Sequence, residues 1–216
     1  RLSTEQGLRI AKRRGNRRSE SVCLLNFAEI ACVEGDPRAA IPLIQDALAL
    51  ANDLGDAKNV GVLLGALGEA HAACGDVNEA LSLLQRTLQD YEESIPIRDK
   101  VRLRGSLAVL KARVGDGEAA KKLLGHGLAQ YADLPRPSLI LLLCKMAEVA
   151  ILLGDSEQAR ATLSKVEALS EPLGLLPTAP IRQAIDSARE HLARSESANA
   201  RLWVDAECGW FRLGEG

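Results

Sequence analysis

Residues 67–84 read LGEAHAACGDVNEALSLL, and this stretch predicts two helices joined by a tight turn. Gly75 can adopt the left-handed backbone conformation that ends a helix, because it has no Cβ. Asp76 can then accept hydrogen bonds from the free N–H groups of the next helix. The small residues Gly68 and Ala80 would let the two helices approach closely. The stretch therefore predicts a closely packed helix pair.

The same pattern recurs along most of the chain. Gly-Asp pairs occur at spacings of 40, 40 and 39 residues, at Gly35-Asp36, Gly75-Asp76, Gly115-Asp116 and Gly154-Asp155. An alanine follows five residues after each glycine, at Ala40, Ala80, Ala120 and Ala159. A large-small pair precedes each glycine, at Phe27-Ala28, Leu67-Gly68, Leu107-Ala108 and Met146-Ala147. A period of this size indicates an all-α solenoid of stacked helix pairs.

This pattern resembles the tetratricopeptide repeat (TPR), and the second unit matches it best. In this family, one position in the first helix of each pair (helix A) holds an aromatic residue. That position is His71 in the second unit and Ala31, Lys111 and Ala150 in the other units. The 40-residue period is similar to the long repeats of large bacterial signalling and transcription regulators and of kinesin light chains. The resemblance implies a right-handed superhelix with a concave groove.

The resemblance also implies which residues line that groove. In this family the groove is lined mainly by the helix-A residue one position past the large-small pair, together with its neighbours one turn away. Those positions are Glu29, Glu69, Val109 and Glu148, and the basic residues around the third one are Arg102, Arg104 and Arg113. We expect an acidic groove with a basic interruption in the third unit. Recurrent Glu could instead simply keep an exposed helix solvated.

We expect residues 1–195 to form the repeat domain. A truncated first repeat covers 1–17, with a helix at 3–14, and a closing helix covers 178–195. The four pairs between them should span about 18–57, 58–97, 98–136 and 137–177. Their helices should cover 18–34 with 37–54, 58–74 with 77–93, 98–114 with 117–132, and 138–153 with 156–171.

The last twenty residues differ in composition from the repeats. Residues 196–201 are polar and small, which is typical of a linker, and 202–213 contain both tryptophans. Alternation around Gly209 predicts a short β-hairpin, so we expect a β-like segment at the start of a following domain. Trp210 to Leu213 resembles the junction after the repeats of certain large bacterial regulators. Because the chain begins with Arg1, we expect it to be a piece of a longer protein.

Composition and charge exclude several classes of protein. The chain has 216 residues, is 47% hydrophobic and carries a net charge of −2, so it has no overall basic field for nucleic acid. The longest apolar run, 139–153, is too short to span a membrane. Five cysteines without a CxxC pair are typical of reduced thiols in a cytoplasmic protein. The chain also contains a basic cluster of Arg9, Lys12, Arg13, Arg14, Arg17 and Arg18. We interpret it as the solvated C-terminal end of a helix, where cations complement the helix dipole, rather than as a binding patch for phosphate or an acidic partner.

No motif for catalysis or metal binding is present. The histidines His71, His126 and His191 lie far apart in the sequence and form no HExxH motif. The segment 115–122 lacks the second glycine and the Ser/Thr of a phosphate loop. We therefore expect no catalytic residues, no metal and no cofactor.

These observations favour a non-catalytic module for protein–protein interaction or scaffolding in a bacterial signalling or transcription regulator. Its partner would be a peptide or a partner domain, including domains of a longer parent protein, with no direct nucleic-acid or membrane contact. The alternative is an effector-sensing repeat domain that binds a small-molecule inducer.

Overall fold

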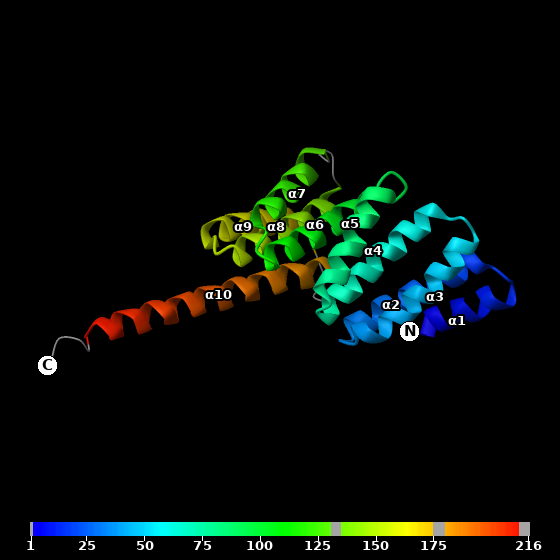
Figure 1. The fold of residues 1–216 in the computed structure, drawn as a ribbon, viewed down its shortest axis with the longest axis horizontal. Helices are drawn as coiled ribbons and strands as arrows, with labels where there is room; N and C mark the ends of the chain where they lie inside the picture. Colours follow the sequence, from blue (N-terminus) through cyan, green and yellow to red (C-terminus); the bar gives the residue numbers. More distant parts are fainter. Residues whose placement is uncertain (1, 131–134, 175–179, 212–216) are drawn as a thin grey trace. The chain divides into compact units, whose positions relative to one another are not determined.

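The computed structural model describes residues 2–130, 135–174 and 180–211 (Figure 1). In these ranges the chain forms ten α-helices, one 3-10 helix (η1) and no strand. The elements are α1 (Leu2–Arg13), α2 (Arg17–Val33), α3 (Pro37–Asp53), α4 (Ala57–Cys74), α5 (Val77–Asp90), α6 (Ile97–Arg113), α7 (Gly117–Gln130), α8 (Arg136–Leu152), α9 (Ser156–Ser170), η1 (Glu171–Leu173) and α10 (Pro180–Phe211). The all-α fold predicted from the repeat is confirmed.

The turns at Asp36, Asp56, Asp116 and Asp155 follow the predicted Gly-Asp chemistry, but the capping bond predicted at Asp76 is not formed, and its carboxylate lies beside His71 instead. Gly35 has φ of 87°, in the left-handed region, and the Asp36 side chain accepts a hydrogen bond from Ala39 N at 3.1 Å. Pro37 occupies the first helical position of α3, where its missing N–H leaves no bond unmade. The local sequence therefore ends one helix and starts the next within three residues.

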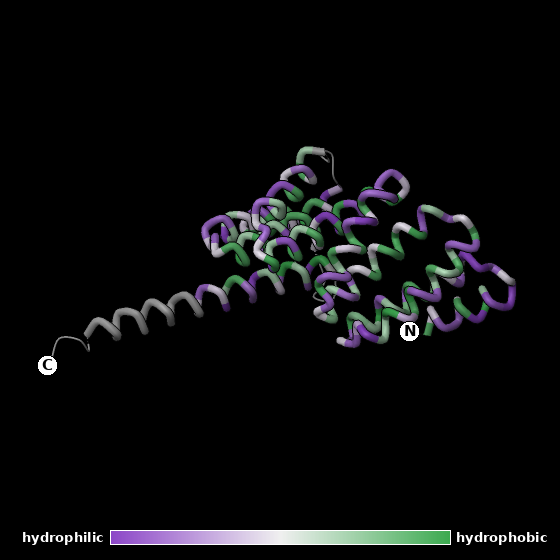
Figure 2. Tube along the Cα trace, viewed as in Figure 1, coloured by the Kyte–Doolittle hydropathy of each residue, from purple (hydrophilic) through white to green (hydrophobic). Residues whose placement is uncertain are grey.

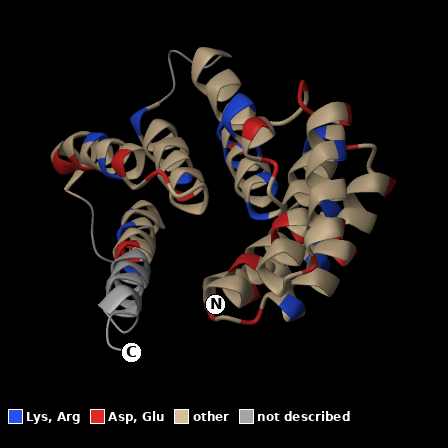
Figure 3. Cartoon of the chain, turned by 60° about the vertical axis from the view of Figure 1, so that its left-hand side comes forward, with Lys and Arg blue, Asp and Glu red and all other residues tan. Residues whose placement is uncertain are grey.

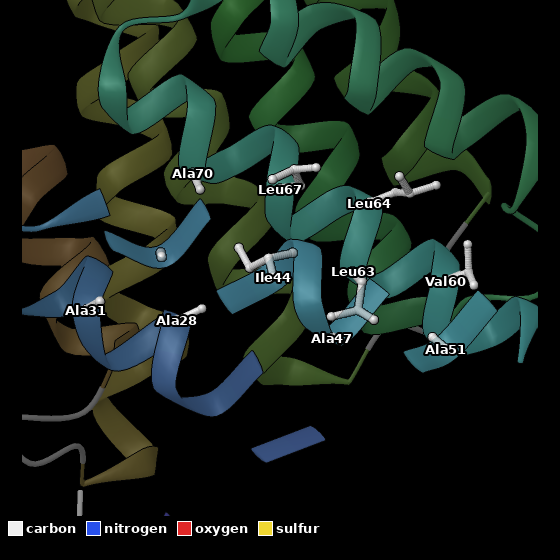
Figure 4. Packing of buried hydrophobic residues seen from close by; sticks show 11 residues of the cluster. Ala28, Ala31, Ile44, Ala47, Ala51, Val60, Leu63, Leu64, Leu67 and Ala70 are labelled. Carbon is white, nitrogen blue, oxygen red and sulfur yellow. The ribbon is translucent and has the colours of Figure 1, made fainter. Parts of the chain in front are cut away.

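The chain divides into two compact units, residues 1–110 (unit 1) and 111–216 (unit 2), and the division falls within α6. In unit 1, α1 packs on α2, α2 on α3, α3 on α4, and α4 on α5. Ile44, Leu63 and Leu67 fill the core of unit 1 together with small residues such as Ala28 and Ala47 (Figure 4).

The small residues lie where helices touch. Ala40, Ala80 and Ala120 are fully buried. A Cβ added at Gly68 would lie 2.9 Å from Cγ of Leu84, closer than real Cβ atoms come. Gly61 is equally crowded, because a Cβ there would lie 2.7 Å from Cβ of Tyr91. The prediction that Gly68 and Ala80 allow close helix packing is confirmed.

Unit 2 contains a second core. Here α7 packs on α8, α8 on α9, and α10 on both α8 and α9. Ile140 of α8, Val166 of α9 and Ile185 of α10 are fully buried in one cluster, and Ala188 and Leu192 of α10 are buried in a neighbouring one. The first part of α10 therefore belongs to the core of unit 2. Hydrophobic and hydrophilic residues are interspersed along the helices of both units (Figure 2).

Most predicted helix ends lie within three residues of the observed ones, but the β-like segment predicted for the tail is not found. α10 continues through residues 196–201, predicted as a linker, and through Phe211, where the sequence predicted a β-hairpin around Gly209. Good helix formers dominate residues 180–206, and a single glycine costs a helix only about 1 kcal/mol, too little to end it alone. Residues 212–213 of the predicted hairpin and 131–132 of the predicted α7 lie outside the described residues.

None of the helices in the described part of the chain is long and apolar enough to cross a membrane.

Candidate functional site

Three consecutive A-helices of unit 1 bring polar residues together on one surface. Arg102 of α6 forms an ion pair with Glu69 of α4, and it also donates to Asp99 Oδ1 at 3.3 Å. Ser106, one turn further along α6, donates to Glu69 Oε1 at 2.8 Å. Glu29 of α2 is exposed and acts electrostatically on Arg102. We call this surface the A-helix face. It comprises Glu29, Glu69, Arg102 and Ser106, together with the exposed residues Val22, Asn26 and Val33 on the same side of α2 as Glu29.

Burial shapes the charges of this face. Burial lowers the pKa of Arg102 from its ordinary value, and the nearby Glu29 carboxylate opposes that shift. Burial raises the pKa of Asp99, against the opposing fields of Arg98 and Lys58. Because Glu69 and Asp99 both contact Arg102, its charge is already balanced within the chain.

Two predicted groove residues lie below the surface. Arg104 is buried and pairs with Glu92, which lies in the turn after α5. Val109 is 4% exposed. Neither side chain is therefore open to a partner in this structure.

The remaining predicted residues meet in unit 2. Arg113 donates to Glu148 Oε1 at 3.1 Å, and Lys145, one turn before Glu148 on α8, donates to Glu148 Oε2 at 2.9 Å. Burial alone would raise the pKa of Glu148, but Lys145, Arg113 and His191 together hold that pKa below its ordinary value. Glu148 is thus a largely covered carboxylate among cationic side chains.

Sequence reasoning found the charged residues but missed their polar partners. Ser106 and Lys145 each lie three residues before a predicted groove position, at Val109 and Glu148 respectively. Residues three apart on a helix share a face. Helical periodicity applied to each predicted position would therefore have found both.

A separate cavity lies between α9 and α10 in unit 2. It has a volume of about 580 Å³ and is open to solvent, with a lining that includes Ser164, Glu167, Ser170, Arg182 and Arg189. Glu167 Oε1 accepts from Arg189 at 3.0 Å (Nε) and 2.7 Å (Nη2). Its volume is in the range of small-molecule pockets, but its lining is more polar than theirs usually is.

Several of the other residues considered in the sequence have partners within the chain. His71 Nδ1 lies 3.1 Å from Asp76 Oδ2, beside the turn that joins α4 to α5. In the basic cluster, Arg17 pairs with Asp53 at 3.2 Å and Arg18 pairs with Asp56 at 3.0 Å. Within the described residues, no three His, Cys, Asp or Glu side chains are grouped to hold a metal ion.

Comparisons with known proteins agree with this architecture. A sequence profile of the tetratricopeptide repeat family matches residues 20–93. No curated protein matches the chain significantly.

Two solved structures are similar in fold. BtubC (BKLC) from P. vanneervenii has a TM-score of 0.65 and 16% identity, with 100% of this chain and 90% of that chain covered. The TPR-like repeats of a Podosopora anserina protein named for kinesin light chain have a TM-score of 0.56 and 21% identity, with 85% and 89% covered. At these identities the likeness concerns the fold, which is an α-solenoid of helix pairs.

Proposed function

We propose, from the premise that this chain is a tetratricopeptide-repeat protein, that its A-helix face binds a peptide or a partner domain. Tetratricopeptide repeats serve in general as scaffolds for protein–protein interaction, and this fold is typically non-catalytic. Stacked helix pairs suit that role, because they offer an extended surface on a rigid support.

One observation carries the proposal: Glu29, Glu69 and Arg102 come from three successive A-helices, and both carboxylates act on Arg102, Glu69 through an ion pair and Glu29 through its field. Residues so far apart in the sequence converge here only because the repeats stack. The contacts of Arg102 with Glu69 and Asp99 hold the surface in one arrangement before a partner arrives. Such preorganisation lowers the entropic cost of binding.

The proposed setting is a cytoplasmic signalling or transcription regulator of a bacterium, in which residues 1–195 are the repeat domain. The 40-residue period and the resemblance of Trp210 to Leu213 to the junction in large regulators support this setting. In such a protein the partner could be another domain of the same chain. The groups at Glu148 and Arg113 of unit 2 are proposed as a second contact region of the same kind.

A selection experiment tests the proposal. A phage-displayed library of random 12-residue peptides is panned against the full chain, and selected peptides are measured by fluorescence anisotropy. We expect Glu29→Lys to weaken their binding about tenfold or more, with an unchanged unfolding midpoint, because Glu29 is exposed. Glu118→Lys is the control, since the Glu118 side chain is 92% exposed on α7 and is not one of the residues of the A-helix face. If no peptide is selected, or if both variants bind like wild type, the proposal is wrong.

The cavity between α9 and α10 supports the second candidate, an effector-sensing domain for a small molecule. Arg182 and Arg189 lie in its lining, so the effector would carry a carboxylate or phosphate. A thermal-shift screen of small organic anions would test this. A rise in the unfolding midpoint that is lost in Arg182→Ala would favour the sensor.

A further inference from the structure

We infer that the partner segment held by α2 on the A-helix face is basic, with apolar residues beside its Lys or Arg. This inference rests on the proposed function and adds the chemistry of the partner. The observations that carry it are the distribution of charge along the chain, the pairing of the acidic groups, and the exposed side chains of α2.

The net charge of the chain conceals a strong separation of charge. Residues 20–93 contain 13 Asp or Glu against three Lys or Arg, a net charge of −10, and the acidic residues are spread over helices and turns of unit 1 (Figure 3). Residues 1–18 contain seven Lys or Arg against one Glu, a net charge of +6. A field of one sign over such a segment steers a partner of the opposite sign.

Many of these acidic groups already have a cation of this chain as partner. Asp53 and Asp56 pair with Arg17 and Arg18, and Glu69 pairs with Arg102. Within the described residues, Glu29 has no cation at ion-pair distance, although Arg102 lies within its field. Glu29 is therefore the carboxylate on this face that can take an incoming Lys or Arg.

Exposed apolar residues lie on both sides of Glu29 along α2, one toward each end of the helix. Val22, Asn26, Glu29 and Val33 are spaced so that they lie along one side of the helix. All four are exposed, Val22 to 44% and Val33 to 79%. From Val22 to Val33 the helix rises about 16 Å. An extended segment of about five residues spans that length.

This chemistry disfavours an acidic partner. Arg102 is the cation of the face, and Glu69 and Asp99 already contact it, so an incoming carboxylate would compete with two others. A second copy of this chain could offer its basic N-terminal segment, but three of the seven cations there, Lys12, Arg17 and Arg18, are already paired within the chain. A basic segment of another protein meets neither obstacle.

The peptide selection described above also tests this inference, through the net charge of the peptides that it selects. We expect the selected peptides to carry an excess of Lys and Arg over Asp and Glu, with aliphatic or aromatic neighbours. We expect their affinity to fall at least threefold between 50 and 300 mM salt, because salt screens the field of the acidic repeats.

The decisive comparison uses two variants with equal change in net charge. Glu29→Lys alters the A-helix face, whereas Asp46→Lys alters an exposed residue of α3 in the same acidic segment. We expect Glu29→Lys to weaken a selected basic peptide at least tenfold and Asp46→Lys to weaken it less than threefold. Equal losses in both variants would show attraction by the general field alone, and would overturn the assignment to Glu29.

Three further outcomes would overturn this inference, and they differ in what they mean for the proposed function. Selected peptides that are neutral or acidic, yet lose affinity in a Val33→Asp variant, would overturn the inference and leave the proposed function standing. A library that yields no binder would overturn both. Self-association of the full chain in sedimentation velocity that Glu29→Lys abolishes would assign the face to a second copy, and would also overturn the inference.

Discussion

Single glycines determine how closely α4 can approach its neighbours. A Cβ at Gly61 would lie 2.6 Å from Cγ2 of Ile95 and 2.7 Å from Cβ of Tyr91. Gly61→Ala should therefore lower the free energy of unfolding by about 1–3 kcal/mol, despite the better helix propensity of alanine. The measurement is urea unfolding followed by circular dichroism at 222 nm.

Gly125 of α7 is the matched control, because a Cβ there would have nothing within 4 Å. Gly125→Ala should raise stability by about 0.5–1 kcal/mol through helix propensity alone. If both alanine variants were equally stabilising, Gly61 would not mark a close approach and the packing described for α4 would be wrong.

The carboxylate of Glu148 makes stability depend on pH. Its folded-state pKa lies below the ordinary value, where Lys145, Arg113 and His191 together outweigh the effect of burial. A depressed carboxyl pKa contributes stability that is fully present above the unfolded-state value, about 4.3, and is lost as pH falls through the folded-state value. Glu148→Gln should therefore lower the unfolding midpoint at pH 7, and the difference from wild type should shrink below about pH 4.

Glu118→Gln serves as the comparison for Glu148→Gln, since the Glu118 side chain is 92% exposed and pairs with Lys121 at 3.5 Å. Exposed pairs of this kind contribute little. Its midpoint should match that of wild type from pH 3 to pH 7. A gap between Glu148→Gln and wild type that stayed constant over this range would exclude titration of Glu148 as the cause.

The starts of α5 and α9 both follow a Gly-Asp pair, but they are not equivalent. Asp155 Oδ1 accepts from Gln158 N at 2.9 Å at the start of α9. Asp76 makes no such bond at the start of α5, and its carboxylate lies beside His71 instead. Asp155→Ala should cost about 1 kcal/mol of stability, and Asp76→Ala about 0.5 kcal/mol or less, the part due to the helix dipole. Thermal unfolding of the two variants measures the difference, and a larger loss for Asp76→Ala would contradict it.

Helix positions could be predicted where the signal is local. α4 was predicted at 58–74 and lies at Ala57–Cys74, because a cap before it and a glycine after it mark both ends. The tail was mispredicted because Gly209 and the short alternation around it are weak against the helix that precedes them. Local signals therefore predict the repeats better than the segment after them.

The partners of the site residues depend on contacts that the sequence does not encode locally. The repeat register placed Glu69 and Arg102 on the same face, but their ion pair depends on how α4 and α6 lie against each other. Arg104 is buried, and it forms an ion pair with Glu92, which lies in the turn after α5. The length and course of that turn are not set by the repeat motif.

In repeat proteins each element is stabilised mainly by its neighbours, so the effect of removing a segment depends on what it covers. In α10, Ile185, Ala188 and Leu192 are buried against α8 and α9. Arg160 of α9 reaches as far as Glu196, and Ser197 Oγ donates to Ala193 O at 2.8 Å. The buried residues Ile185, Ala188 and Leu192 therefore tie the first part of α10 to the core of unit 2.

Truncation after Ser197 keeps the buried residues Ile185, Ala188 and Leu192, and we expect it to leave the unfolding midpoint within about 1 °C of the full chain. Ile185→Ala in the full chain should instead lower stability by about 2–4 kcal/mol. Ile185 is fully buried, and its removal leaves a cavity beside Ile140 and Val166. Differential scanning calorimetry of the two proteins beside wild type makes the comparison. If the truncation cost several degrees, residues 198–216 would contribute to the stability of the repeats, and the proposal that the repeat domain ends at 195 would have to be abandoned.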